Sequence, residues 1–522
     1  MYHFKLEEMT VEQKLGMTYC ARPFKDADLA FTLELIKKRL IGSVQVPPSK
    51  PHYMKQIREA ADYPIIIVCD TETGFPVSQR QQIPLITLGA CNKKEYYQVF
   101  AKSVVTEARA AGFNATWNPV TDIQGGNGPA RVYRTFSDDV QRVCEAAEAI
   151  CEVYKRNGYM SCGKHYPGSR SHPYDSHMTP TVSDSDEEDL KNRGLVPYKY
   201  LMDRGLLPSI MTSHRTIPKI DPDNAGTMSP KVQRLIRDMG WDGVCWSDSF
   251  AMMAILQQYG EENILGLAIA AGNDIVLPNY RTPVEVSWGH LQKNYADGMF
   301  SEERLNEAAR RVIELQETLA AIPECVDVFT EEDQKLYDSI ASASITAVCD
   351  EGVPAALEND GKKRLFVVLT PNDFNAQEEE LFETTAATWY FPQNVAKRIR
   401  ENFPGARVEF MPEFPHKKDN ERVLVASTEC DETIFVTYCD TQAYLGTDDL
   451  TRRVEVVIDC INMAGKLGGV VHFGNPYALE PLQHVKRMIF GYNMPGAQPC
   501  AIDALAGKQD APGTLPVNCK FK

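Results

Sequence analysis

The strongest constraint on the fold is an alternation of short apolar runs with amphipathic segments between about residues 40 and 280. The apolar runs have the length and composition of β-strands, and stretches such as 94–111 and 140–157 between them have helical periodicity. Because parallel strands need long crossover connections, this alternation predicts an α/β fold with a parallel sheet covered by helices. The runs are 41–47, 64–70, 115–119, 161–165, 208–214, 243–248 and 274–278.

Polar residues at the ends of these runs discriminate between an open doubly wound sheet and a closed barrel. The residues concerned are Asp70, Asp122, Lys164, His165, His214, Asp248 and Asn279. A barrel enzyme builds its site from the carboxyl ends of many strands, whereas an open sheet uses one switch point and usually a glycine-rich phosphate loop. The segment 125–128 (Gly-Gly-Asn-Gly) does not fit that loop. We therefore expect a (β/α)8 TIM-type barrel over residues 1–325.

The pattern changes after about residue 323. An acidic segment predicts a helical connector over residues 326–345, and a second alternating set of runs predicts a smaller α/β domain over residues 346–522. A chain of 522 residues is also longer than one hydrophobic core usually serves, so more than one domain is expected. The second set of runs is 364–370, 407–411, 432–438 and 469–473.

The overall charge and the cysteine pattern narrow the class of partner. A formal net charge of −16 disfavours binding to nucleic acid or to an anionic membrane surface, since both repel a negative body. The N-terminus is polar rather than signal-like, and the apolar runs fall far short of the ~20 residues that a membrane span needs. Fourteen cysteines show no CxxC spacing, which is typical of a reducing compartment. We expect a cytoplasmic protein without a metal or other cofactor.

The segment 164–177 is the richest in groups that can transfer protons. It begins with Lys164 and His165 and ends with Asp175 and His177, which are two positions apart. A hydrogen bond from the His177 imidazole to Asp175 would fix its tautomer and raise its basicity, which suits proton transfer near neutral pH. Two other interpretations remain open: an exposed polar loop, and a metal site built from His165, His172 and His177, although HxxxH spacing is absent.

Asp248 lies directly after an apolar run and before a helical one. A carboxylate at such a junction either caps the helix or faces a ligand at the strand end, and the spacing alone supports both equally. The same two interpretations apply to Asp70, Glu72 and Asp122.

Taken in order, these segments resemble glycoside hydrolase family 3, and within it the bacterial β-N-acetylhexosaminidases that remove N-acetylglucosamine from muropeptide fragments. The resemblance covers about residues 8–320, and the C-terminal part looks like the α/β sandwich domain of longer members. The similar segments are Lys164 to His177 for the loop KH(F/Y)PGxGxxxxDSH, Cys245 to Ile255 for SDxxxMxAI, Asp70 to Gly74 for DxEGG, and Asn118 to Asp122 with Arg134 to Phe136 for PVxD…RSF.

The resemblance implies a retaining hydrolase that releases a terminal β-linked N-acetylhexosamine from cell-wall fragments. Asp248 would attack the anomeric carbon, and His177, oriented by Asp175, would first protonate the leaving oxygen and then activate water. It further implies a small carbohydrate as substrate and no cofactor. Independently of the resemblance, the C-terminal domain is a candidate for completing the active site, for binding cell-wall glycan or for forming a homodimer. The implied substrate-binding residues are Asp70, Arg134, Lys164 and His165, with Asp122 and His214 as further candidates.

Three departures from the family pattern affect the sugar-binding residues rather than the reaction centre. Ser169-Arg-Ser-His172 replaces the usual HGDT, Phe75-Pro-Val-Ser78 replaces the arginine-bearing RVxR, and Ser249 replaces an acidic residue. Arg80 and Arg170 are candidate substitutes for the missing arginine. The departures leave open a glycoside phosphorylase, a β-glucosidase-type enzyme and a non-catalytic sugar-binding homologue. A phosphorylase is compatible with a histidine acid/base, since histidine does not repel an incoming phosphate.

Overall fold

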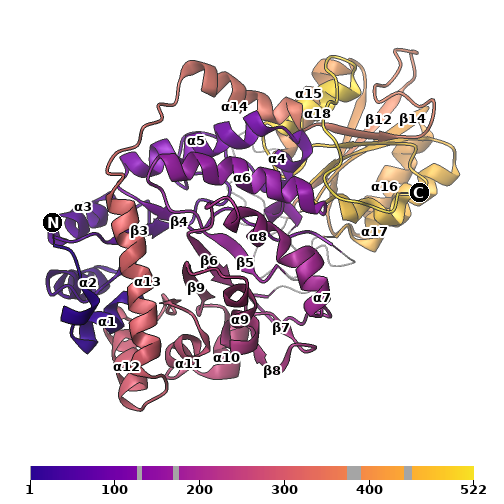
Figure 1. The fold of residues 1–522 in the computed structure, drawn as a ribbon. Coiled ribbons are helices and arrows are strands. Elements are labelled where there is room, and N and C mark those ends of the chain that lie inside the picture. The colour runs from indigo at the N-terminus through magenta and orange to yellow at the C-terminus, as the bar shows by residue number, and fades with distance from the viewer. Residues whose placement is uncertain (1, 126–131, 169–175, 373–388, 440–448, 522) are drawn as a thin grey trace. The chain divides into compact units, whose positions relative to one another are not determined.

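The computed structural model describes residues 2–125, 132–168, 176–372, 389–439 and 449–521 (Figure 1). They divide into two compact units, each formed by three stretches of chain. Unit 1 comprises Met1–Gln79, Tyr97–Gly128 and Val140–Asp333, and unit 2 comprises Arg80–Tyr96, Pro129–Asp139 and Gln334–Lys522.

Unit 1 contains two four-stranded parallel sheets and a short antiparallel strand pair. The first sheet has the order β1 (Cys20–Ala21), β2 (Ser43–Gln45), β3 (Ile66–Cys69) and β4 (Ala115–Thr116). The second has the order β10 (Ile275–Leu277), β9 (Val244–Ser249), β6 (Ser209–Thr212) and β5 (Gly163–Tyr166). The antiparallel pair is β7 (Thr216–Ile217) and β8 (Asp221–Ala225).

The α/β class and the parallel strands agree with the sequence, but the expected closed barrel is not formed as one continuous strand ladder. The edge strands β1 and β4 have only two residues each, too few to extend a ladder beyond one neighbour. Isolated parallel bridges occur at these edges instead. They join Tyr19 to Val276, Ala115 to Met160, and Val120 to Lys164.

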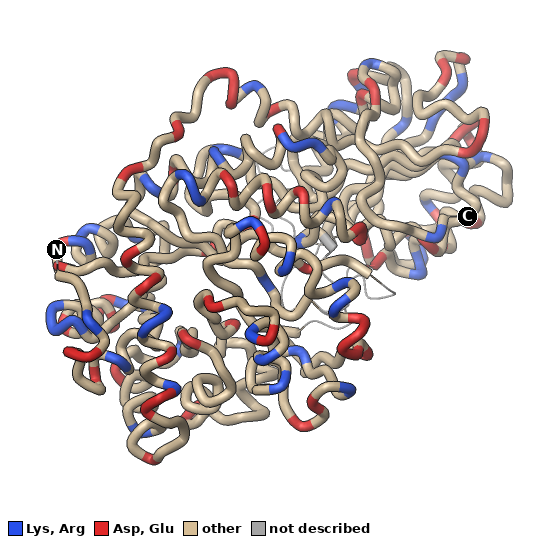
Figure 2. Tube along the Cα trace, viewed as in Figure 1, with Lys and Arg blue, Asp and Glu red and all other residues tan. Residues whose placement is uncertain are grey.

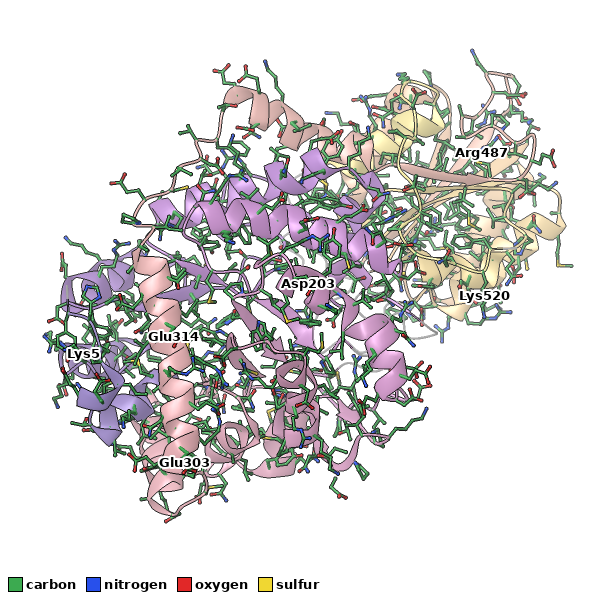
Figure 3. All side chains as sticks on the ribbon, in the orientation of Figure 1. Lys5, Asp203, Glu303, Glu314, Arg487 and Lys520 are labelled. Carbon is green, nitrogen blue, oxygen red and sulfur yellow. The ribbon has the colours of Figure 1, made fainter. Side chains whose placement is uncertain are left out.

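The helices of unit 1 are amphipathic and bury one face against the sheets. In α13 (Glu302–Ala320), Leu305, Val312 and Leu315 are buried, whereas Glu303 and Glu314 point outward (Figure 3). The other helices are η1 (Leu6–Glu8), α1 (Val11–Met17), α2 (Asp26–Lys37), α3 (Pro51–Ala60), α5 (Lys94–Ala110), α6 (Val140–Arg156), α7 (Glu187–Asp189), η3 (Leu190–Gly194), α8 (Val196–Met202), η4 (Gly226–Met228), α9 (Pro230–Asp238), α10 (Met253–Tyr259), α11 (Ile264–Ala271) and α12 (Val284–Ala296).

A buried carboxylate anchors the amino-terminal ends of β9 and β10. Asp274 is fully buried and pairs with Arg237, Arg304 and Arg311 at N–O distances of 2.5 to 3.1 Å. The backbone N–H of Cys245, near the start of β9, donates to the same carboxylate at 2.9 Å. This end of the two strands is therefore held by a charge-neutralised network.

Unit 2 is built on a six-stranded sheet in the order β11-β16-β15-β14-β12-β13, in which only β11 pairs antiparallel. The predicted runs became β12 (Arg364–Thr370), β13 (Arg407–Pro412), β14 (Glu432–Tyr438) and β15 (Leu467–Phe473), and the sequence had not predicted β11 (Thr346–Cys349) or β16 (Arg487–Phe490). Val367 is in register with Glu409 on one side and Phe435 on the other.

The helices of unit 2 include the acidic one expected between the two sets of strands. This helix is α14 (Glu331–Ala343), and its first three residues belong to unit 1. The others are α4 (Leu85–Cys91), η2 (Val132–Arg134), α15 (Pro392–Asn402), α16 (Lys417–Thr428), α17 (Arg452–Met463), η5 (Pro476–Leu482) and α18 (Ala497–Leu505).

Two observations bear on possible binding partners. Among the described helices, none is both long and apolar enough to cross a bilayer. Acidic and basic residues are scattered along the trace of each unit (Figure 2), so the acidic residues are not confined to one segment.

Candidate active site

Polar side chains from several strands of unit 1 gather at the carboxyl ends of those strands. Asp70 follows β3, Lys164 and His165 lie in β5, His214 follows β6, and Asp248 lies near the end of β9. Parallel strands present their carboxyl ends at one side of the structure, where α/β enzymes place their sites. Among these residues, Lys164 pairs with Asp70, and the charges of His165 and His214 act on Asp248.

Lys164 connects β5 to the segment after β3. Its side chain is 2% exposed, and its ammonium lies 3.0 Å from Glu72 Oε2 and 3.2 Å from Asp70 Oδ2. A buried ammonium needs such partners to offset its desolvation. The side chain of Asp70 is 50% exposed, so its carboxylate can also accept hydrogen bonds from a ligand.

His165 is held by Asp122 at two points. Its Nδ1–H donates to Asp122 Oδ2 at 2.7 Å, and its backbone N–H donates to Oδ1 at 3.2 Å. Burial raises the pKa of Asp122, but the charge and hydrogen bonds of His165 outweigh this and lower it overall. Because Nδ1 carries the bonded proton, Nε2 is the nitrogen that can face a ligand. The Lys164–His165 peptide bond is cis.

Asp248 has one carboxylate oxygen engaged and one available. Its Oδ1 accepts a hydrogen bond from the backbone N–H of Ser249 at 2.6 Å, and no other described residue donates to this carboxylate. Asp248 is half-buried rather than sealed in the core. An available oxygen at the mouth of the strands is what a nucleophilic carboxylate requires.

The histidines around Asp248 keep its carboxyl group ionised. Burial raises the pKa of Asp248, but the charge of His214 and the effects of neighbouring groups lower it by more. The resulting pKa is about 2. His165, the Ser249 N–H and His177 lower the pKa in the same direction. At neutral pH Asp248 is an anion.

His214 holds the backbone next to Asp248. Its Nε2–H donates to the backbone carbonyl of Ser249 at 3.1 Å, so Nδ1 accepts from the hydroxyl of Thr227 at 2.9 Å in the neutral form. The ring stacks on Phe250 with centroids 5.5 Å apart. Burial lowers the pKa of His214. Both ring nitrogens are occupied, so His214 holds the Ser249 backbone beside Asp248, and the sugar-binding role that the resemblance implies for His214 stays a prediction.

The sequence analysis missed Arg22, which lies beside Asp248. Its Nη1 donates to Ser249 Oγ at 2.8 Å, and its charge acts on Asp248. The signal was present, because Arg22 directly follows β1 and thus obeys the same strand-end rule as Asp70 and Asp248. The run at residues 19–21 was too short to be recognised as a strand.

The remaining predicted residues are only partly placed. His177 is half-buried and its charge reaches Asp248, whereas Asp175, His172 and Arg170 lie outside the described residues. Arg134 is the last residue of η2, in unit 2. Arg80 also belongs to unit 2, and its Nε donates to Gln334 Oε1. Within the described ranges, no three His, Cys, Asp or Glu side chains are grouped to hold a metal ion.

A family profile matches the part of the chain that carries these residues. The profile, described as the glycosyl hydrolase family 3 N-terminal domain, matches residues 31–315, more than half of the 522 residues. A curated relative from Cellulomonas fimi, named beta-N-acetylglucosaminidase/beta-glucosidase, is 23% identical over 560 aligned positions, with 98% of this chain and 94% of that protein covered.

Solved structures are similar over almost the whole chain. A glycoside hydrolase family 3 beta-N-acetylglucosaminidase from Paenibacillus sp. str. FPU-7 aligns with a TM-score of 0.77 and 22% identity, covering 98% of this chain and all of the other. The beta-glucoside phosphorylase BglX bound to 2FGlc aligns with a TM-score of 0.80 and 21% identity, covering 98% and 95%. At these identities the structures establish a shared fold and nothing finer.

Proposed function

The chain belongs to glycosyl hydrolase family 3 and is therefore a glycoside hydrolase, and on this premise we propose that it is a retaining enzyme that releases a terminal β-linked N-acetylhexosamine. N-acetylglucosamine from cell-wall fragments is the proposed product. The names of the Cellulomonas fimi relative and of the Paenibacillus structure support the sugar. The observation that carries the chemistry is the carboxylate of Asp248, ionised and with one oxygen available at the strand ends.

In the first step, Asp248 attacks the anomeric carbon as the bond to the leaving oxygen breaks. The carboxylate is suited to this because its low pKa keeps it anionic at neutral pH, and because it can stabilise the oxocarbenium-like transition state. Ser249 N–H and the His214–Ser249 hydrogen bond hold the turn from which Asp248 projects. A covalent glycosyl-enzyme results.

His177 is the proposed acid/base, oriented by Asp175. It protonates the leaving oxygen in the first step and removes a proton from water in the second, and the attack of that water releases the sugar from Asp248. The electrostatic effect of His177 on Asp248 supports their convergence on one bond. Asp70, Lys164 and His165 are proposed to bind sugar hydroxyls, with Arg134, Asp122 and His214 as further binding residues.

The proposal also includes a closed (β/α)8 barrel for residues 1–325, followed by a connector and the C-terminal α/β domain. The bridges between the two sheets support closure, because they link the β1 edge to β10 and the β4 edge to β5. Among the described residues no two cysteines form a disulfide, which supports a reducing cytoplasmic location. The expected homodimer is a further proposal, which light scattering of the purified protein can test.

Two experiments test the proposed reaction. A panel of nitrophenyl N-acetylglucosaminide, glucoside and xyloside should show the highest kcat/KM for the N-acetylglucosaminide, and Asp248→Ala should lose this activity. A 5-fluoro N-acetylglucosaminyl fluoride should add one glycosyl group to the wild type, measured by intact mass. The adduct should be absent in Asp248→Ala and present in Asp297→Asn, a change of an exposed carboxylate. An adduct that persists in Asp248→Ala would contradict the assignment.

The second candidate is a phosphorylase, favoured by the histidine acid/base and by the similarity to a beta-glucoside phosphorylase fold. A neutral imidazole admits phosphate where a carboxylate would repel it. Reactions with and without phosphate separate the two candidates. The hydrolase proposal expects free sugar in both, and sugar 1-phosphate as the main product would replace it by phosphorolysis.

A further inference from the structure

We propose that Arg22 binds the carbonyl oxygen of the 2-acetamido group of the substrate and thereby contributes to the choice of an N-acetylhexosamine. This inference rests on the proposed function of the Asp248 site. It concerns a residue outside the segments that resemble the family motifs.

Arg22 is a buried guanidinium whose position is fixed on several sides. It is 6% exposed. Its Nε donates to Gln45 Oε1 on β2, and its Nη1 donates to Ser249 Oγ and to the backbone carbonyl of Pro278, both at 2.8 Å. The guanidinium carbon also lies 4.9 Å from the ring centroid of Tyr280. An arginine held in this way is preorganised, so it loses little conformational entropy when it binds a ligand.

The second terminal nitrogen of Arg22 has no hydrogen-bond partner within the described residues. The bonds above use Nε and Nη1, and Nη2 is also not among the polar atoms that are sealed from solvent without a partner. Two N–H groups of a cation therefore face accessible space in an otherwise buried side chain. Burial lowers the pKa of Arg22 to about 10, so the group is still a cation at neutral pH. Such a group favours a strong acceptor.

Arg22 and the nucleophile are anchored to the same residue. Ser249 accepts from Arg22 through Oγ and donates to Asp248 through its backbone N–H. Because Asp248 attacks C1, a donor fixed next to it is nearest to the substituents beside C1. Of the two ring atoms bonded to C1, only C2 carries a substituent with an acceptor, and hydrogen bonds at this position strengthen in the transition state.

The chemistry of the donor selects the acetamide over a hydroxyl group. A guanidinium has only N–H donors and accepts nothing, so it matches an amide carbonyl, which is a stronger acceptor than a hydroxyl oxygen. Arg22 also lies close to Ser249, the position where the resemblance expects a second acidic residue. A serine there leaves the guanidinium charge unneutralised by contact, because no carboxylate pairs with Arg22 among the described residues.

The test compares substrates that differ only at C2. The quantity measured is the ratio of kcat/KM for nitrophenyl N-acetylglucosaminide to kcat/KM for nitrophenyl glucoside. Loss of one charge-assisted hydrogen bond in Arg22→Lys should lower this ratio about 10- to 100-fold. Asp297→Asn, a change of an exposed carboxylate at the end of α12, is the control and should leave the ratio unchanged.

A substrate analogue gives a second measurement that needs no variant. The N-thioacetyl substrate replaces the carbonyl oxygen by sulfur, a weak acceptor, and should react about 10-fold more slowly than the acetamide with the wild type. In Arg22→Lys this difference should disappear. If Arg22→Lys lowers activity on the glucoside and the N-acetylglucosaminide by the same factor, or the sulfur has no effect on the wild type, Arg22 is only a structural clamp. A wild type inactive on all these glycosides would instead refute the proposed function itself.

Discussion

Two carboxylates at opposite ends of the strand pair β9 and β10, one fully buried and one half-buried, have opposite surroundings. Asp274, at the amino-terminal end, accepts hydrogen bonds from three arginines and one backbone N–H, and its side chain is fully buried. Asp248, near the carboxyl end of β9, accepts one described hydrogen bond, from Ser249. A buried carboxylate such as Asp274 stabilises the fold when all its oxygens accept hydrogen bonds. A carboxylate with an oxygen that accepts none, such as Asp248, can react with a ligand. Barrel-type enzymes separate the two tasks between their two ends in the same way.

The largest effect expected from this contrast is on catalysis. Asp248→Asn should lower kcat by about 10³-fold or more, because the amide cannot form the glycosyl-enzyme. The melting temperature should change little, since Asn keeps an acceptor for Ser249 N–H. Initial rates with nitrophenyl N-acetylglucosaminide and a thermal melt measure the two quantities. A collapse of stability in this variant would mean that Asp248 belongs with Asp274 as a structural carboxylate.

The second expected effect is a loss of folding stability with little loss of catalysis, the reverse of the effect of Asp248→Asn. Asp274→Asn should lower the free energy of unfolding by about 3–5 kcal/mol, because it leaves three arginine side chains without their shared buried anion. Urea denaturation measures the change in the free energy of unfolding. At low temperature, where the variant is folded, its kcat should be close to that of the wild type. A stable variant with lost activity would break the comparison.

A smaller effect should come from His214 and appear as a pH dependence. Burial lowers the pKa of His214 in the folded protein below its usual 6.5. The unfolded chain therefore binds more protons than the folded one below about pH 7, and stability must fall as the pH drops through this range, by less than about 1.4 kcal/mol per pH unit. The difference in unfolding free energy between pH 7.5 and 5.5 should be smaller in His214→Leu. An equal pH dependence in both proteins would show that His214 is not the group responsible.

The smallest expected effect is that of removing an exposed carboxylate, which serves as the reference for the three variants above. Asp297 forms an exposed pair with Lys293 at the end of α12. Asp297→Asn should change the free energy of unfolding by less than about 0.5 kcal/mol, since solvent screens such pairs. Urea denaturation of this variant beside Asp274→Asn separates the effect of burial from that of removing a carboxylate. A loss of unfolding free energy as large as that of Asp274→Asn would show that burial does not explain the effect of Asp274.

The candidate site was predictable where chemistry sits at the end of a recognisable strand. Asp70, Lys164, His165 and Asp248 were found this way, and the contacts of Lys164 with Asp70 and of His165 with Asp122 confirm that these segments meet. Arg22 was missed because β1 has two residues, too few for a periodic signal. The hydrogen bonds of His214 were not predictable either, since its partners Thr227 and Ser249 are distant in the chain and no spacing rule connects them.

The sequence by itself determined the α/β class, the positions of most strands and the family, because hydrophobic periodicity and residue order are local properties of the chain. Only the tertiary structure decided how the charges are completed: which carboxylate is fully paired, which keeps an available oxygen, and which arginine lies beside it. The reason is that pairing depends on contacts between residues as far apart as Arg22 and Ser249. Such contacts exist only after the strands have packed together.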